Sequence, residues 1–180
     1  GLELSETELL HQCIFMLNAG HETSTNMLSH GLNELINHKD QYKLLQKEPG
    51  RIDTAIDEIL RFQPPIQINN RRCLEKTKLG DVVVPEGTSV HMIIAGANRD
   101  PLQFFEPETF DISRSPNRHL SFGLGIHICA GINLARVEAK VAFQSLMSSF
   151  KEINLLKKPK VANRIRFREI KEMQIEVSSF

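Results

Sequence analysis

Residues 122–131, FGLGIHICAG, place Cys129 among three glycines and directly before an apolar helical pattern. Glycine permits backbone conformations closed to other residues and lets a bulky group come close to the chain. A thiol at the start of a helix faces unpaired N–H groups and the positive end of the helix dipole, and both favour the thiolate. The stretch therefore predicts a glycine-lined loop that presents one sulfur anion, either as a nucleophile or as a metal ligand.

Several kinds of site use such a sulfur atom. A lone cysteine is most often a small buried hydrophobic side chain, but that interpretation leaves the glycines unexplained. A zinc site built from His119, His127 and Cys129 lacks the second cysteine pair of familiar zinc frameworks. A cysteine nucleophile would have its base, His127, only two residues away. Neither explains why the loop is so poor in side chains, whereas a large flat ligand does.

The composition is that of an ordinary globular protein. The 180 residues suit one domain, predicted over 1–180, with 41% hydrophobic and 24% charged residues. The 22 basic and 22 acidic side chains cancel, which gives no electrostatic case for nucleic acid or an anionic membrane. There is no apolar run of ~18 residues and no signal-peptide pattern, and the three cysteines are widely spaced. We therefore predict a soluble cytoplasmic protein with no nucleic-acid or membrane partner.

Helices are predicted at both ends of the chain. Ser5 and Glu8 form a capping box, and the apolar spacing behind them predicts a long helix that reaches Ile36. Residues 19–25, AGHETST, are poor helix formers, so a local distortion is expected there. Further helices are predicted over 41–46, 51–62 and 132–150.

The middle of the chain is predicted to be extended. Residues 66–85 indicate strands and turns, and 89–94 a further strand. Residues 98–117 lack periodicity and predict a long ordered meander, and 164–167 with 174–177 predict a final hairpin. The predicted fold class is mainly α with small β-sheets (α+β).

Two polar pairs carry little information on their own. Glu58 and Arg61 are three residues apart on a predicted helix, a spacing typical of a solvated surface pair. Glu22 and Thr23 are adjacent, so they line one groove only if the helix bulges between them. Neither pair marks a functional site by itself.

Three motifs follow one another in a familiar order. They are residues 19–24 (AGHETS), the Glu58-x-x-Arg61 helix and the cysteine loop over 122–131. They resemble the oxygen-activating motif, the Glu-x-x-Arg helix and the cysteine-ligand loop of the cytochrome P-450 haem-thiolate monooxygenases. The bacterial soluble branch of that family is resembled by two further segments, 97–101 and 110–114. The likeness covers nearly all of the chain.

The resemblance implies a proximal haem site. Cys129 would be the thiolate ligand of the iron of haem b, a ligand whose electron donation favours O–O cleavage. His127 would hydrogen-bond one haem propionate, and Phe122 would pack near the sulfur and tune its redox potential. Arg71 would bind the second propionate, with Arg72 as the alternative if the register shifts by one. Close approach to the porphyrin is implied for Gly123, Gly125 and Gly131.

The resemblance also implies a support beneath that site and a distal side opposite it. Glu58, Arg61 and Arg114 would form a buried triad that holds the cysteine loop and the meander. The acid–alcohol pair Glu22 and Thr23 would deliver protons to bound dioxygen. Room for oxygen and substrate would come from Ala19 and Gly20. A mainly apolar organic substrate would touch residues 66–68 (Ile66, Gln67 and Ile68).

A ferredoxin-type electron donor is the partner that the resemblance implies. Arg136 and Lys140 could add to a basic docking face, although such side chains are usually only solvated charges.

The chain is much shorter than full members of that family. It resembles their C-terminal portion, with the N-terminal half absent, so the distal helix is expected to expose apolar surface. The isolated chain is then expected to retain haem weakly or not at all. The alternative is a truncated, non-catalytic fragment.

Overall fold

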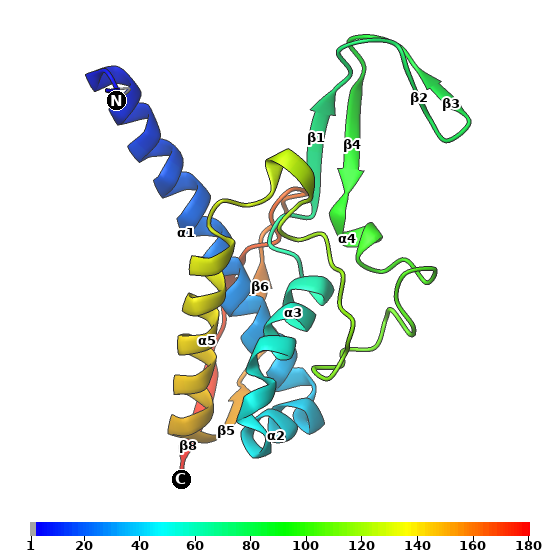
Figure 1. The fold of residues 1–180 in the computed structure, drawn as a ribbon. Helices are drawn as coiled ribbons and strands as arrows, with labels where there is room; N and C mark the ends of the chain where they lie inside the picture. The colour runs from blue at the N-terminus through cyan, green and yellow to red at the C-terminus, as the bar shows by residue number, and fades with distance from the viewer. Residues whose placement is uncertain (1–2) are drawn as a thin grey trace.

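The long helices pack side by side into one body (Figure 1) in a computed structural model that describes residues 3–180. The helices of this body are α1 (Glu6–Asn37), α2 (Lys39–Lys47), α3 (Ile52–Phe62) and α5 (Ile132–Ser149). A Cβ added at Gly31 of α1 would lie 2.6 Å from Phe143 Cζ and 2.9 Å from Ile59 Cγ2. A glycine is therefore needed where α1 approaches α3 and α5. Ile59 and Phe143 both belong to the hydrophobic core.

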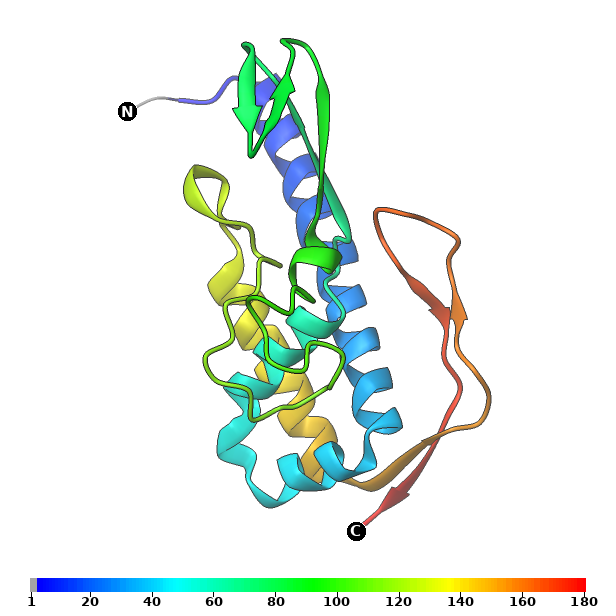
Figure 2. The ribbon, with the colours of Figure 1, turned by 90° about the vertical axis from the view of Figure 1, so that its right-hand side faces the viewer.

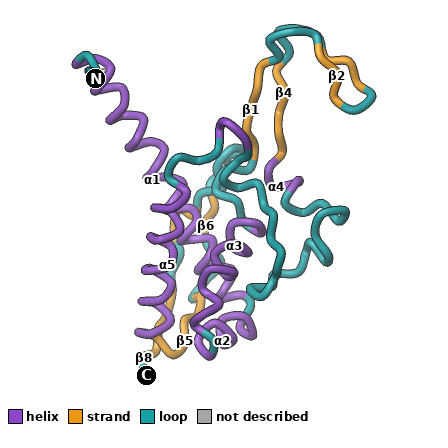
Figure 3. Tube along the Cα trace, viewed as in Figure 1, coloured by secondary structure: helices purple, strands orange, loops and turns teal. Residues whose placement is uncertain are grey.

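The remaining elements are small (Figure 3). The described residues form four two-stranded antiparallel sheets, which pair β1 (Ile68–Arg72) with β4 (Ser89–Ile93), β2 (Thr77–Leu79) with β3 (Val82–Val84), β5 (Phe150–Leu155) with β8 (Ile175–Ser179), and β6 (Lys160–Val161) with β7 (Ile170–Glu172). The short helices are η1 (Pro49–Arg51), α4 (Ile94–Ala97) and η2 (Gly125–His127). The predicted class, mainly α with small β-sheets, is confirmed. A single domain over 1–180 stays a prediction, and its first two residues lie outside the described part.

The start of α1 matches its predicted capping box. The Glu8 N–H donates to Ser5 Oγ at 3.3 Å, and the Ser5 N–H donates to Glu8 Oε2 at 2.9 Å. The expected distortion over residues 19–25 is wrong, because α1 runs unbroken through this stretch. Thr23 and Thr25 donate their hydroxyls to the carbonyl oxygens one turn earlier, at 2.6 and 2.9 Å. This bonding satisfies the hydroxyls without interrupting the helix.

The predicted hairpin of 164–167 with 174–177 is wrong. The 164–167 segment is a loop that does not pair with 174–177. It contacts other segments through the bridge of Ile66 with Phe167, the Gln67 N–H that donates to the Arg166 carbonyl oxygen at 2.9 Å, and the contact of Arg164 with Glu22. The real partner of β8 is β5, which starts at Phe150 directly after α5 ends. The apolar spacing predicts a helix as far as Phe150, whereas α5 ends at Ser149 and Phe150 is the first residue of β5. Ile153 of β5 is completely buried against the helices, which favours the non-local pairing.

Several segments extend from the same end of the helical body. Figures 1 and 2 show the first half of α1, the cysteine loop and the β1–β4 hairpin all on the side away from the C-terminus. Large apolar side chains on this half of α1 are exposed, namely Leu9, Leu10, Ile14, Phe15, Met16 and Leu17. The expected exposure of apolar surface on this helix is confirmed. No helix within residues 3–180 combines the length and the apolar character needed to cross a membrane.

His30 gives the fold a pH dependence. Burial lowers the pKa of His30 and outweighs the hydrogen bond to the Arg168 carbonyl oxygen and the charge of Glu34, which act in the opposite direction. Below pH ~6.5 the His30 imidazole of the unfolded chain binds a proton, whereas the same imidazole in the folded chain binds one only at lower pH. We expect the free energy of unfolding to fall by up to about 1.4 kcal/mol per pH unit as the pH drops below that value. Urea titrations at pH 7.5 and 5.5 measure this difference.

The control for this prediction is a histidine elsewhere on α1. His30→Gln should reduce the loss of stability on acidification, whereas His11→Gln should leave it unchanged because His11 is exposed. Equal losses in the two variants would contradict the assignment to His30.

Candidate functional site

The cysteine loop, residues 122–131, folds back on itself in front of α5. The Cys129 N–H donates to the Phe122 carbonyl oxygen at 2.8 Å. Gly123 and Gly125 have φ angles of 74° and 75°, a left-handed conformation that other residues rarely adopt. The loop therefore depends on glycine at these two positions to bring Cys129 to the start of the helix. The Cys129 residue is exposed there.

The cysteine loop exposes bare backbone and apolar side chains to solvent. A Cβ added at Gly125 would meet no atom within 4 Å, and the side chains of Leu124 and Ile126 are 80% and 97% exposed. A thiol beside bare backbone and apolar side chains fits a flat, largely apolar group that carries a metal with affinity for sulfur. The zinc hypothesis fails, because within residues 3–180 no three His, Cys, Asp or Glu residues gather as metal ligands.

Glu58 and Arg61 form a fully buried ion pair. Arg61 Nε and Nη2 donate to the two carboxylate oxygens of Glu58, both at 2.7 Å, and both side chains are 0% exposed. The expectation of a solvated surface pair, made from spacing alone, is therefore wrong. A bidentate pair of this kind is tolerated in the interior because the geometry satisfies both charges.

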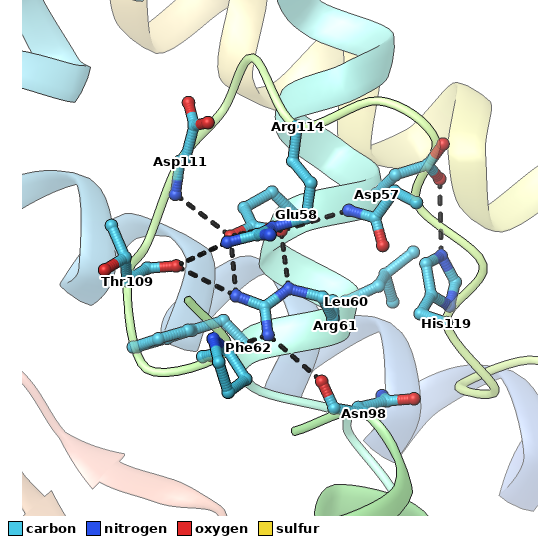
Figure 4. Close-up of polar contacts among 12 residues, drawn as sticks. Asp57, Glu58, Leu60, Arg61, Phe62, Asn98, Thr109, Asp111, Arg114 and His119 are labelled. Carbon is cyan, nitrogen blue, oxygen red and sulfur yellow. Dashed lines mark hydrogen bonds and ion pairs between the residues drawn. The ribbon is translucent and has the colours of Figure 1, made fainter. Parts of the chain in front are cut away.

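The meander wraps this pair (Figure 4). Arg61 donates its other N–H groups to the carbonyl oxygens of Asn98, Pro107 and Thr109, at 2.8–3.0 Å. Arg114 Nε donates to Glu58 Oε2 at 3.1 Å. The three residues implied as a triad are thus in contact, and they fasten residues 98–114 to α3.

Asn98 connects this buried cluster to the residues directly before the cysteine loop. The sequence did not predict this role of Asn98. Its side chain accepts from the Leu120 N–H at 2.8 Å and donates to Ser121 Oγ at 3.0 Å. Ser121 Oγ in turn donates to the Leu60 carbonyl oxygen of α3 at 2.6 Å. An asparagine in an aperiodic segment carries no sequence signal of burial, yet Asn98 is 0% exposed.

The two basic residues expected on a docking face are paired with acids. Arg136 Nη2 lies 2.7 Å from Asp57 Oδ1, and Lys140 Nζ lies 3.1 Å from Asp53 Oδ2. Both pairs join α5 to α3 one turn apart. Their positive charges are therefore largely compensated within the chain.

The candidate distal residues lie on the middle of α1. Because the helix is unbroken, Glu22 and Thr23 project ~100° apart, so the expected shared groove is not formed by a bulge. Glu22 Oε1 accepts from Arg164 Nη1 at 2.6 Å. Next to them, Ser24 Oγ donates to Glu138 Oε2 of α5 at 2.8 Å. The contacts from Arg164 and Glu138 come from distant segments and were not predicted.

The glycine and alanine of the same stretch leave the helix surface uncovered. A Cβ added at Gly20 would meet no atom within 4 Å, and Ala19 is exposed. Arg71 and His127, the implied propionate ligands, are also exposed, and Arg71 donates to the Asn70 carbonyl oxygen at 2.9 Å. Arg72, the alternative to Arg71, is the next residue of β1.

A groove of about 420 Å³ borders the segment expected to touch substrate. Gln67, just before β1, and Ile68, its first residue, line one side of the groove. The 162–169 loop lines it with Arg164, Ile165 and Arg168. The groove therefore carries two arginines in addition to the single polar contact expected from residues 66–68, and Arg164 is the one paired with Glu22. Both arginines come from the 162–169 loop, which includes residues 164–167 that the sequence predicted as a strand.

Comparison with known proteins agrees with this arrangement. The family model described as Cytochrome P450 matches residues 1–166. The Biotin biosynthesis cytochrome P450 of Bacillus subtilis is 40% identical over 153 residues, which is 85% of this chain and 39% of that protein. The polyketide biosynthesis cytochrome P450 PksS of Bacillus subtilis is 40% identical over 160 residues, 88% of this chain and 40% of that protein. The chain thus spans about two fifths of the length of these relatives.

A solved structure shares the whole described fold. P450BioI in complex with an acyl carrier protein ligated to hexadec-9Z-enoic acid superimposes with a TM-score of 0.96 at 37% identity. The match covers 99% of this chain and 47% of that one.

Proposed function

The chain belongs to the cytochrome P450 family, and from this premise we propose that it is the haem-binding, C-terminal portion of a monooxygenase. The observation that carries the proposal is the cysteine loop, which presents Cys129 exposed beside two left-handed glycines and apolar side chains. The proposed reaction inserts one oxygen atom from O2 into a mainly apolar organic substrate. A ferredoxin-type donor and a cytoplasmic location belong to the same proposal.

Cys129 would hold the iron of haem b through its sulfur. When bound, haem supplies the metal at which dioxygen is activated, and a thiolate ligand favours O–O cleavage. The glycines Gly123, Gly125 and Gly131 would leave room for the ring to lie close to the loop. The exposed His127 and Arg71 would bind the propionates, and Phe122 would pack near the sulfur.

Glu22 and Thr23 of α1 would transfer protons on the distal side of the site, opposite Cys129. Thr23 Oγ1 donates its own proton to the Ala19 carbonyl oxygen. Its lone pairs can accept a hydrogen bond from a water, and passing a proton on would require the hydroxyl to rotate away from that carbonyl oxygen. The Glu22 carboxylate would hold and pass on a proton, which requires it to exchange its contact with Arg164 for an ordered water. Ala19 and Gly20 leave space for oxygen and substrate beside these groups.

We predict that Thr23→Ala separates haem binding from turnover. In the haem-loaded full-length protein the variant should bind haem normally and form product about a hundredfold more slowly, because a positioned proton carrier contributes on this scale. The rate of product formation and the product formed per electron consumed are the measurements. Thr25→Ala is the matched control, since Thr25 makes the same type of bond to its own helix. Equal product yields in the two variants would contradict the role of Thr23.

Haem titration tests the proposed function. The reduced protein with carbon monoxide should give a thiolate-type absorbance band when the chain is part of its full-length protein. The isolated chain should give a weak band or none, because the apolar half of α1 is exposed. A full band from the isolated chain would overturn the expected weak retention. No haem binding by the full-length protein would overturn the proposed function and favour the non-catalytic alternative.

A further inference from the structure

Three polar side chains from distant segments meet beside the cysteine loop. Asp57 lies on α3, His119 precedes the loop, and Arg136 lies on α5. Asp57 Oδ1 is 3.4 Å from His119 Nε2 and 2.7 Å from Arg136 Nη2. The His119 side chain is 4% exposed and that of Asp57 25% exposed. One carboxylate oxygen therefore joins both helices to the loop, and Figure 4 shows its contact with His119.

The hydrogen bonds define how His119 is oriented. Its Nδ1 accepts from the Ser121 N–H at 3.2 Å. The ring proton must then be on Nε2, which faces Asp57. This arrangement gives the imidazole one orientation and points its ring toward Phe122, with ring centroids 6.0 Å apart.

Phe122 is held from two sides by this cluster. The guanidinium carbon of Arg136 lies 5.6 Å from the centre of the Phe122 ring, within the range of a cation–π contact, and His119 packs against the same ring. Phe122 is also the residue whose carbonyl oxygen accepts the Cys129 N–H. The cluster is thus one contact away from the backbone of the cysteine.

We propose that Asp57 is a positioning residue for Cys129. By holding His119 and Arg136 against Phe122, it fixes the backbone bond that sets the direction of the thiol. The significance of this for catalysis rests on the proposed haem ligation, but the effect on the loop does not. Partial burial alone would raise the pKa of Asp57, but the hydrogen bond from His119 and the charge of Arg136 outweigh it and keep that pKa below its ordinary value. Asp57 therefore stays charged at neutral pH.

The chain contains a matched control for this cluster. Asp53 and Lys140 join the same two helices with a 3.1 Å ion pair, one turn away from Asp57 and Arg136. Asp53→Asn and Asp57→Asn each remove one ion pair between α3 and α5. Only Asp57→Asn replaces the charged acceptor shared by His119 and Arg136 with a neutral amide.

Amide hydrogen exchange of the haem-free chain tests the proposal directly. We expect residues 120–131, including the Cys129 amide, to exchange about tenfold faster or more in Asp57→Asn than in Asp53→Asn, the scale of a lost charge-assisted hydrogen bond. Exchange in the core of α3 should be the same in both variants, which excludes global unfolding. Asp57→Glu, which keeps the charge, should restore part of the protection. Equal exchange of the loop in the two Asn variants would overturn the proposal.

A second measurement reports on the haem-bound protein. In the full-length protein, Asp57→Asn should shift the reduction potential and decrease the share of the thiolate-type band, whereas Asp53→Asn should match the wild type. A haem signal unchanged by Asp57→Asn would overturn the link from the loop to the thiolate. If the wild type binds no haem, the proposed function fails while the exchange result stands.

Discussion

Glu58→Gln should lower the free energy of unfolding by about 3–5 kcal/mol. The substitution keeps the size of the side chain but removes the charge that faces Arg61. Arg61 is 0% exposed and would remain as a buried cation, with amide oxygen in place of two carboxylate contacts of 2.7 Å. A loss of this size is a large part of the stability of an ordinary domain. Urea denaturation followed by circular dichroism measures it.

The same chain supplies the control for this effect. Glu48 and Arg51 have the same spacing and a contact of 2.6 Å, but their side chains are 41% and 39% exposed. Glu48→Gln should therefore cost less than about 1 kcal/mol, as exposed ion pairs do. If both variants lost the same small amount, the buried pair would not be the support of the meander that its contacts indicate.

The burial of one of these two ion pairs could not be predicted from the sequence. The apolar spacing of α3 predicted the helix correctly, yet the spacing of Glu58 and Arg61 is the same as that of the exposed pair Glu48 and Arg51. Burial is decided by the carbonyl oxygens of residues 98–109, which reach Arg61 from about 40 positions away in the chain. Periodicity reports only which face of a helix is apolar, so it cannot show which segment covers it.

The cysteine loop was predictable because its causes are local. The left-handed glycines and the start of α5 are all encoded within ten residues. The cluster of Asp57, His119 and Arg136 was missed because its members come from three segments. The β5–β8 sheet was missed for the same reason, since its strands pair across the 19 residues 156–174 of intervening loop and hairpin. Long-range pairing depends on which surfaces the helices leave uncovered, and a single sequence does not report this.

The α1 stretch shows the opposite error. Its threonines and glycine have poor helix propensity, so a distortion was predicted, but the helix is unbroken. Propensity differences of at most about 1 kcal/mol per residue are small beside the packing of the second half of α1. The residues buried there include Met27, Leu35 and Ile36.

Cys129→Ser should abolish the thiolate-type band of the reduced, carbon-monoxide-bound full-length protein. A serine hydroxyl is neutral at pH 7 and is a far weaker ligand than a thiolate for a metal that favours sulfur. The fold should be unaffected, because Cys129 is exposed and its bond to the loop is made by the backbone N–H, which serine keeps. We expect a change in unfolding free energy within about 0.5 kcal/mol.

Cys73→Ser is the matched control, since Cys73 lies just after β1 and far along the chain from the loop. It should leave the band intact. Cys129→His is the second variant, because an imidazole binds iron but gives a haem spectrum without thiolate character. Loss of the band in both Cys129 variants with a normal unfolding transition assigns the ligand to the sulfur of Cys129. A band that survives Cys129→Ser would mean that another residue holds the metal, and the glycine-lined loop would then need a different role.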